Sequence, residues 1–276
     1  MTNPFAVIMQ VTRASCVAPQ IVPCTLDGTS LSAASGAFYR YNDRVFLISN
    51  WHVFSGVNPA TGQSLSGHAT PHALSLRYRS LPDGVVALPH ETVVQLWQPD
   101  MSARTWLEHP TLGRQVDVAA LDVTELVGPA MNCANDDIQH TDFALGVGDR
   151  VFVLGYPKGI SGGFYYPIWK QASIASEPVL NHSDLPRFLI DCSSTEGMSG
   201  APVIFRGHSY LVPDASVPAG QYGYSMGKTI QRFMGLYSGR VAKLAAELSS
   251  DPMAAQLGFV WKREAIHEVV AAGRAA

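Results

Sequence analysis

No uninterrupted apolar run in the 276 residues approaches the roughly 18 residues that a membrane-spanning helix needs. Charged residues are also scarce, at 15%, and the formal net charge is only −3. Such a chain has neither the basic field that attracts nucleic acid nor a polybasic patch for a membrane surface. The first residues, Met1 to Phe5, lack the basic start and apolar core of a secretory signal. We therefore expect a cytoplasmic protein that binds neither nucleic acid nor membranes.

Cysteine is rare as well, and the cysteines have no metal-ligand spacing. The four are Cys16, Cys24, Cys133 and Cys192. In a reducing compartment we expect free thiols, with a Cys16–Cys24 bridge as the alternative. His68 and His72 are four residues apart, but Pro71 opposes a helix there and no third ligand is evident. We expect no metal and no cofactor.

Short apolar runs separated by Gly, Pro, Asn and Asp dominate the sequence and predict an all-β protein of barrels or sandwiches. The expected strands are 5–11, 35–41, 44–48, 73–78, 92–98, 118–123, 150–155, 167–175, 187–191, 201–205, 232–237 and 258–262. A polar stretch from Gly128 to Asp149 separates two halves, and helices are expected at 241–248, after Asp251-Pro252, and at 264–272.

Three motifs stand beside predicted strands in the chain order His, Asp, Ser. An apolar run ends in Ser49-Asn50-Trp51-His52-Val53, and Asp117 begins the apolar run Val118-Ala119-Ala120-Leu121. The third motif is Gly197-Met198-Ser199-Gly200-Ala201-Pro202-Val203. A Gly-x-Ser-Gly turn exposes a serine hydroxyl and directs backbone N–H groups into one space, as nucleophilic catalysis needs.

Together these motifs resemble the chymotrypsin-like (trypsin-fold) serine peptidases in their bacterial trypsin-like form. The resemblance covers about residues 30 to 240 and includes the second-barrel opening from Leu145 to Pro157. It implies two six-stranded antiparallel β-barrels with a C-terminal helix. Residues 1–130 would carry His52 and Asp117, and residues 131–276 would carry Ser199, the two forming one peptidase domain.

The resemblance also implies the role of each residue in a serine endopeptidase that acts through an acyl-enzyme. Ser199 would attack, His52 would move the proton, and Asp117 would orient the imidazole. The Gly197 and Ser199 N–H groups would form the oxyanion hole. Asp122 competes for the acid role, but five residues from Asp117 it points to the opposite face of a strand.

Specificity follows from the same resemblance. Ser193 would form the floor of the pocket, and Tyr237, Ser238 and Gly239 its opposite wall. Because Ser193 is uncharged, we expect a small or medium uncharged residue before the scissile bond of a protein or peptide substrate. Met198 stands where secreted relatives place an aspartate that receives a freed amino terminus, so activity should not require amino-terminal cleavage. A protease without that switch leaves room for an unidentified regulatory partner.

Two other classes compete with this interpretation. An α/β-hydrolase needs Gly-x-Ser-x-Gly and the chain order Ser, Asp, His, but Ala201 replaces the last glycine and the best histidine precedes the serine. A catalytically silent binding protein with a peptidase fold is the stronger alternative. The loops 57–72 and 206–228 are candidate substrate-shaping segments, and the second could cover the site.

Overall fold

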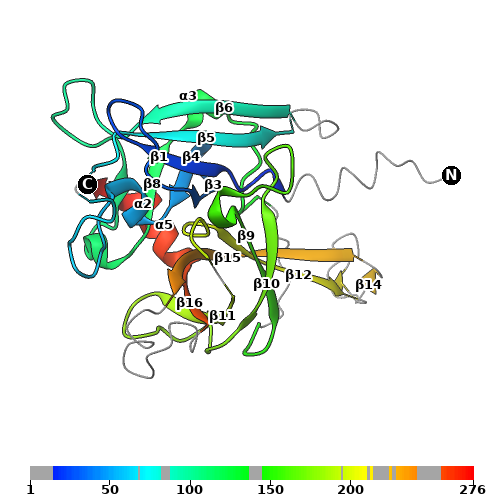
Figure 1. Ribbon diagram of the computed structural model, residues 1–276. Helices are drawn as coiled ribbons and strands as arrows, with labels where there is room; N and C mark the ends of the chain where they lie inside the picture. The colour runs from blue at the N-terminus through cyan, green and yellow to red at the C-terminus, as the bar shows by residue number, and fades with distance from the viewer. Residues whose placement is uncertain are drawn as a thin grey trace.

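The computed structural model describes residues 15–67, 69–81, 88–136, 145–193, 195–209, 212–213, 224–225, 228–240 and 256–276. Most of the regular structure is β-strand, arranged in two halves that lie one above the other in Figure 1. The predicted strand 5–11 and the predicted helices at 241–248 and after Asp251 lie outside the described residues.

The second half forms a closed barrel in which each strand is antiparallel to both neighbours. In barrel order the strands are β10 (Ile168–Ile174), β11 (Arg187–Asp191), β16 (Leu257–Lys262), β15 (Lys228–Arg240), β12 (Pro202–Ser209) and β9 (Arg150–Gly155). The bounds predicted for β9 and β11 are confirmed. Val151 and Val153 alternate with half-buried Phe152, because successive side chains of a strand face opposite sides.

The first half consists of two sheets rather than the single closed six-stranded barrel that we expected. One has the order β2 (Ala34–Ser35), β1 (Gln20–Cys24), β5 (Ala73–Ser80) and β6 (Leu88–Gln95). The other has the order β17 (Arg274–Ala275), β7 (Leu107–Glu108), β8 (Ala119–Asp122), β4 (Arg44–Ser49) and β3 (Ala37–Tyr41). A small sheet of β13 (Val212–Pro213) and β14 (Tyr224–Ser225) completes the strands of the described residues.

The helices are short except for the last one. Those that lie wholly within the described residues are α2 (Trp51–Ser55), α3 (Thr124–Val127) and α5 (Arg263–Ala272), with 3₁₀ turns η1 (Gly113–Gln115) and η2 (Pro157–Gly159). Helix α5 confirms the predicted C-terminal helix at 264–272, although it begins one residue earlier, at Arg263. None of the helices in the described ranges is long and apolar enough to cross a membrane.

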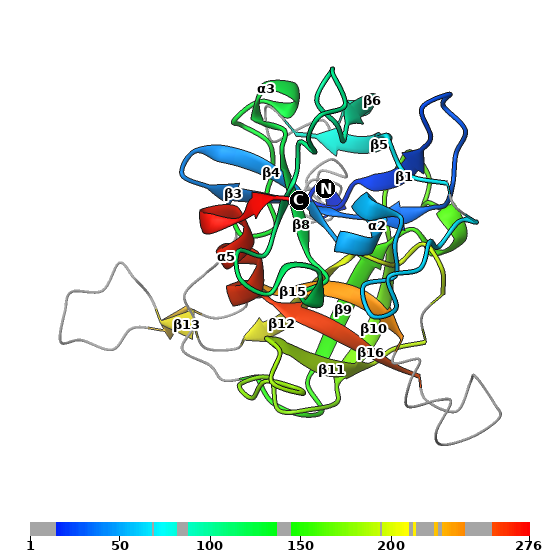
Figure 2. The same ribbon diagram turned by 90° about the vertical axis from the view of Figure 1, so that its left-hand side faces the viewer.

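Helix α5 joins the two halves, as Figure 2 shows in red. Its buried residues Ala265, Ile266, Val269 and Val270 lie on one face, the pattern of an amphipathic helix. They belong to one apolar cluster with Ile48 and Val118 of the first half and Leu154, Ile204 and Trp261 of the second. Strand β17 then pairs with β7, so the last residues complete a sheet of the first half.

All four cysteines are free thiols, as expected from the sequence, and the alternative of a Cys16–Cys24 bridge is wrong. Burial raises the pKa of Cys16 to about 11 and that of Cys133 to about 12. Both thiols therefore stay protonated and unreactive at neutral pH.

Candidate active site

His52 and Asp117 are brought together by the pairing of β4 with β8. The two strands are antiparallel, and Ser49 at the end of β4 lies opposite Ala119 at the start of β8. The chain leaves β4 into α2, whose second residue is His52, while Asp117 lies two residues before β8. Residues that follow one strand must therefore lie beside residues that precede the other.

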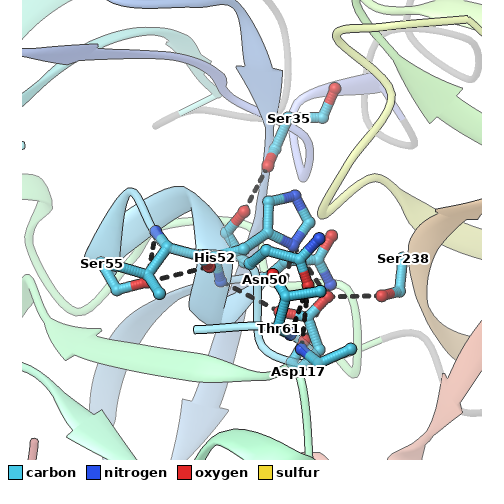
Figure 3. Close-up of polar contacts among 11 residues, drawn as sticks. Ser35, Asn50, His52, Ser55, Thr61, Asp117 and Ser238 are labelled. Carbon is cyan, nitrogen blue, oxygen red and sulfur yellow. Dashed lines mark hydrogen bonds and ion pairs between the residues drawn. The ribbon is translucent and has the colours of Figure 1, made fainter. Parts of the chain in front are cut away.

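The Asp117 carboxylate binds both the ring and the backbone of His52. His52 Nδ1 lies 2.8 Å from Asp117 Oδ2 and 3.1 Å from Oδ1. The His52 backbone N–H donates to Oδ1 at 3.0 Å. Ser238 Oγ donates to Oδ2 at 2.5 Å, and the buried Asn50 side chain donates to the Asp117 carbonyl at 2.9 Å. Figure 3 shows these contacts converging on Asp117, which is almost fully buried.

The environment of His52 favours its charged form. Burial alone lowers the pKa of the imidazole, but the negative charge of Asp117 and its hydrogen bond to the ring raise it more. The pKa of His52 therefore lies above its ordinary value of 6.5. The ring is 18% exposed, so one side remains accessible.

Asp122 has a separate role in the fold. Its carboxylate accepts hydrogen bonds from the backbone and the hydroxyl of Thr124 at 2.9 and 2.6 Å, and it forms an ion pair with Arg44. It therefore fixes the start of α3 rather than contacting His52. The structure brings Asp117, and not Asp122, to the histidine.

Ser199 stands in a turn whose backbone only glycine permits. Gly197 and Gly200 have φ of +90° and +80°, a region that residues with a side chain rarely adopt. A Cβ on Gly197 would lie 2.2 Å from the Tyr156 carbonyl oxygen, and one on Gly200 would lie 2.0 Å from Ser49 Oγ. These close approaches fix the turn against its neighbours.

Ser35, from the first half, makes two hydrogen bonds to this turn and a third to Tyr156. Its Oγ donates to the Gly197 carbonyl at 2.7 Å and accepts from the Tyr156 N–H at 3.1 Å. Its backbone N–H donates to the Ser199 carbonyl at 2.9 Å. The Ser35 carbonyl in turn accepts from Ser49 Oγ at 2.7 Å, as Figure 3 shows. Sequence reasoning missed Ser35, because nothing local distinguishes it from other serines beside a glycine.

Replacing Ser35 with alanine should lower the free energy of unfolding by about 1–3 kcal/mol. The change leaves the buried Gly197 carbonyl and Tyr156 N–H without their partner, and each such loss is costly. Urea denaturation measures the effect. The exposed Ser30→Ala is the matched control, and equal stabilities of the two variants would contradict the assigned contacts.

The predicted nucleophile and base share one cavity of about 710 Å³, which is lined by His52, Gly197 and Ser199 among others. Within the described residues no hydrogen bond joins the Ser199 hydroxyl to the His52 ring. Catalytic hydrogen bonds are often long before substrate binds. The N–H groups of Gly197 and Ser199 have no acceptor in the described part of the chain, so both can donate to a bound oxygen.

The four residues expected to contact substrate have different surroundings. Ser193 is exposed, and its carbonyl accepts a hydrogen bond from the Lys170 ammonium. Tyr237 is fully buried, with its ring against Gly258. The hydroxyl of Ser238 binds Asp117, a contact that sequence did not predict, and Gly239 has φ of +91° with open space beside it.

The structure offers no support for a metal centre at His72. Its Nδ1 lies 2.9 Å from the Thr70 carbonyl, and His68 lies outside the described residues. No cluster of three or more His, Cys, Asp or Glu suited to a metal ion occurs in the part of the chain that is described.

No protein-family model and no curated protein matches the chain. Among solved structures it is similar to the Rv3671c protease from M. tuberculosis in its active form, at 17% identity and a TM-score of 0.48, covering 99% of this chain and 88% of that one. It is also similar to the protease Anisep from Arthrobacter nicotinovorans, at 14% identity and a TM-score of 0.44, covering 93% and 96%. Both of these proteins are proteases.

Proposed function

We propose that the protein is a serine endopeptidase of the chymotrypsin-like type, which hydrolyses peptide bonds through an acyl-enzyme. One observation carries the proposal. The imidazole of His52, held by the buried carboxylate of Asp117, lines the same cavity as Ser199 and Gly197. A base, an orienting acid, a nucleophile and free N–H donors are the parts that acyl transfer needs.

Each residue has a defined role in the proposed reaction. Asp117 accepts the Nδ1 proton of His52, which leaves Nε2 free to take the Ser199 proton as Oγ attacks the scissile carbonyl. The imidazolium that forms is stabilised by the carboxylate and then protonates the leaving amine. Water, activated by the same imidazole, releases the acyl group. No metal or cofactor enters these steps.

The Gly197 and Ser199 N–H groups would bind the oxyanion of the tetrahedral intermediate. Ser35 would keep both amides in place, because it contacts the carbonyl of each of these residues. Donors that are positioned before the reaction stabilise developing charge without reorganising. Met198 is fully buried in the apolar core of the closed barrel, where an uncharged side chain needs no ionic partner. We propose that the site forms without an amino-terminal cleavage.

A small or medium uncharged residue should precede the scissile bond. Ser193 brings no carboxylate to the proposed floor of the specificity pocket, and the buried Tyr237 ring fills space beside Gly258. A long basic side chain would therefore find no carboxylate at the Ser193 position.

A catalytically silent binding protein is the second candidate. The observation that favours it is the absence, in the described residues, of a hydrogen bond between Ser199 and His52. Such a protein would bind peptides in the cavity without cleaving them.

The pH dependence of peptide cleavage distinguishes the two candidates. We expect kcat/KM, measured on a mixed peptide library by mass spectrometry, to rise with pH through a pKa above 6.5, because the base must be neutral and Asp117 favours the charged ring. In Asp117→Asn both causes that raise the pKa are lost and burial remains. An NMR titration should then place the His52 pKa below 6.5, and kcat should fall about 10⁴-fold. No cleavage at any pH, or a His52 pKa that Asp117→Asn does not lower, would contradict the proposal.

A further inference from the structure

The cavity that holds Ser199 and His52 extends well beyond them, and its remaining lining has an apolar part and a polar part. The lining residues on which the inference depends are Leu31, Val53, Leu65, Pro71, Lys158 and Glu196. All but the last two come from the first half. Lys158 and Glu196 form the one charged stretch of the lining besides His52, and both are exposed.

The two nitrogens of His52 define which part of a substrate enters this cavity. Nδ1 is bound to Asp117, on the side where Ser238 also lies. Neither Asp117 nor any residue of β15 lines the cavity, whereas His52 does. Because Nδ1 is bound to Asp117, Nε2 is the nitrogen left free, and in the proposed reaction it protonates the leaving amine. The residues that follow the scissile bond would thus lie in this cavity.

The apolar wall is built onto the helix that carries His52. The Gly56 N–H donates to the His52 carbonyl at 3.0 Å, and the Leu65 N–H donates to the Gly56 carbonyl at 2.8 Å. Pro71 packs against Gly56 so closely that a Cβ there would lie 2.5 Å from its ring. Leu65 is nevertheless 52% exposed. A preformed wall with exposed apolar surface gains from being covered by an apolar group.

The polar part of the lining is formed by Lys158 and Glu196. Lys158 has φ 51° and ψ 30°, a conformation in which a side chain costs energy, and its N–H donates to the Glu196 carbonyl at 2.7 Å. Because the Lys158 and Glu196 side chains carry opposite charges, this polar part of the lining, the rim, has no net charge. A substrate chain would then run between an apolar wall and a neutral, polar rim.

We propose that this cavity binds the residue immediately after the scissile bond and selects an apolar side chain there. The inference rests on the proposed peptidase activity and adds a specificity on the leaving side. Leu31, Val53 and Leu65 would contact that side chain. An acidic side chain would lose its hydration against the same residues without gaining a partner.

Capture of the acyl-enzyme by added amines tests this directly. N-acetyl-alanine 4-nitrophenyl ester acylates Ser199 and releases 4-nitrophenolate, which leaves the cavity empty in the acyl-enzyme. Leucine amide, glycine amide or aspartate amide then competes with water. The unprotonated amine forms the new amide bond as the Ser199 ester bond breaks. His52 takes one proton from the attacking amine and transfers it to the Ser199 oxygen. We expect leucine amide to be captured about tenfold more efficiently than glycine amide, and aspartate amide less efficiently than either.

Two variants in the wall and one outside it complete the test. Leu65→Asp and Leu31→Asp should each reduce the preference for leucine amide over glycine amide to about twofold or less. The control Leu26→Asp changes a leucine that is 76% exposed and does not line the cavity, so it should keep the wild-type preference. Equal capture of the three amides by the wild type, or an unchanged preference in both wall variants, would overturn the inference while ester hydrolysis still supported the peptidase. Ester hydrolysis no faster than that of Ser199→Ala would instead overturn the peptidase itself.

Discussion

Ser199→Ala is expected to reduce peptide cleavage by at least about 10³-fold while leaving the fold unchanged. The substitution removes the proposed nucleophile. Because triad residues act together, the loss of one of them removes most of the rate enhancement that all three provide. Stability should be retained because no hydrogen bond of the Ser199 hydroxyl occurs in the described residues. The rate is measured on the best peptide from the library, together with thermal unfolding.

A second serine serves as a control, because it distinguishes the loss of the nucleophile from a general effect of replacing a serine in the barrel. Ser173 on β10 belongs to the same closed barrel, and Ser173→Ala should keep the wild-type rate. If Ser199→Ala retained a tenth or more of the wild-type rate, the assignment of the nucleophile would be wrong.

Gly197→Ala is expected to lower kcat by about 10²–10³-fold, the usual effect of losing one oxyanion donor. The added Cβ would lie 2.2 Å from the Tyr156 carbonyl oxygen and 2.9 Å from the Lys158 nitrogen, so the backbone must move. That movement takes the Gly197 N–H away from the position where the oxyanion forms. The free energy of unfolding should fall as well, by about 1–3 kcal/mol, because alanine is strained at φ +90°.

Gly128→Ala is the control, because it introduces the same kind of backbone strain as Gly197→Ala but brings the added Cβ into no close contact. Gly128 has φ of +77°, but no atom lies within 4 Å of the Cβ that it would gain. This variant should lose stability and keep its kcat, whereas Gly197→Ala should lose both. A kcat for Gly197→Ala within threefold of the wild type would argue against Gly197 as a donor.

The regular strands could be predicted from sequence because their signal is local. The bounds of β9 and β11 follow directly from short apolar runs between turn residues. Strand β1 was missed because Pro23 interrupts its pattern. The structure tolerates this proline because β2 pairs only with Gln20 and Ile21, so the proline lies beyond the ladder on that side. The helix α2 was missed because a helix of five residues is too short to show helical periodicity.

The site was predictable in part, for a similar reason. His52 and Asp117 could be placed together because each follows or precedes a recognisable strand. The contacts of Ser35 with Gly197 and of Ser238 with Asp117 join residues 162 and 121 positions apart. No local pattern encodes such pairs, because they depend on how the two halves pack. The pairing of β17 with β7 is also long-range and was not predicted.

Labelling with a fluorophosphonate probe, followed by mass spectrometry of the digested protein, tests the central claim most directly. Such probes react with a serine whose hydroxyl is activated by a neighbouring base. We expect a single adduct on the peptide that contains Ser199, no adduct in Ser199→Ala, and much slower labelling in His52→Ala. A folded wild-type protein that acquires no adduct, or acquires it on another serine, would contradict the claim that Ser199 is an activated nucleophile.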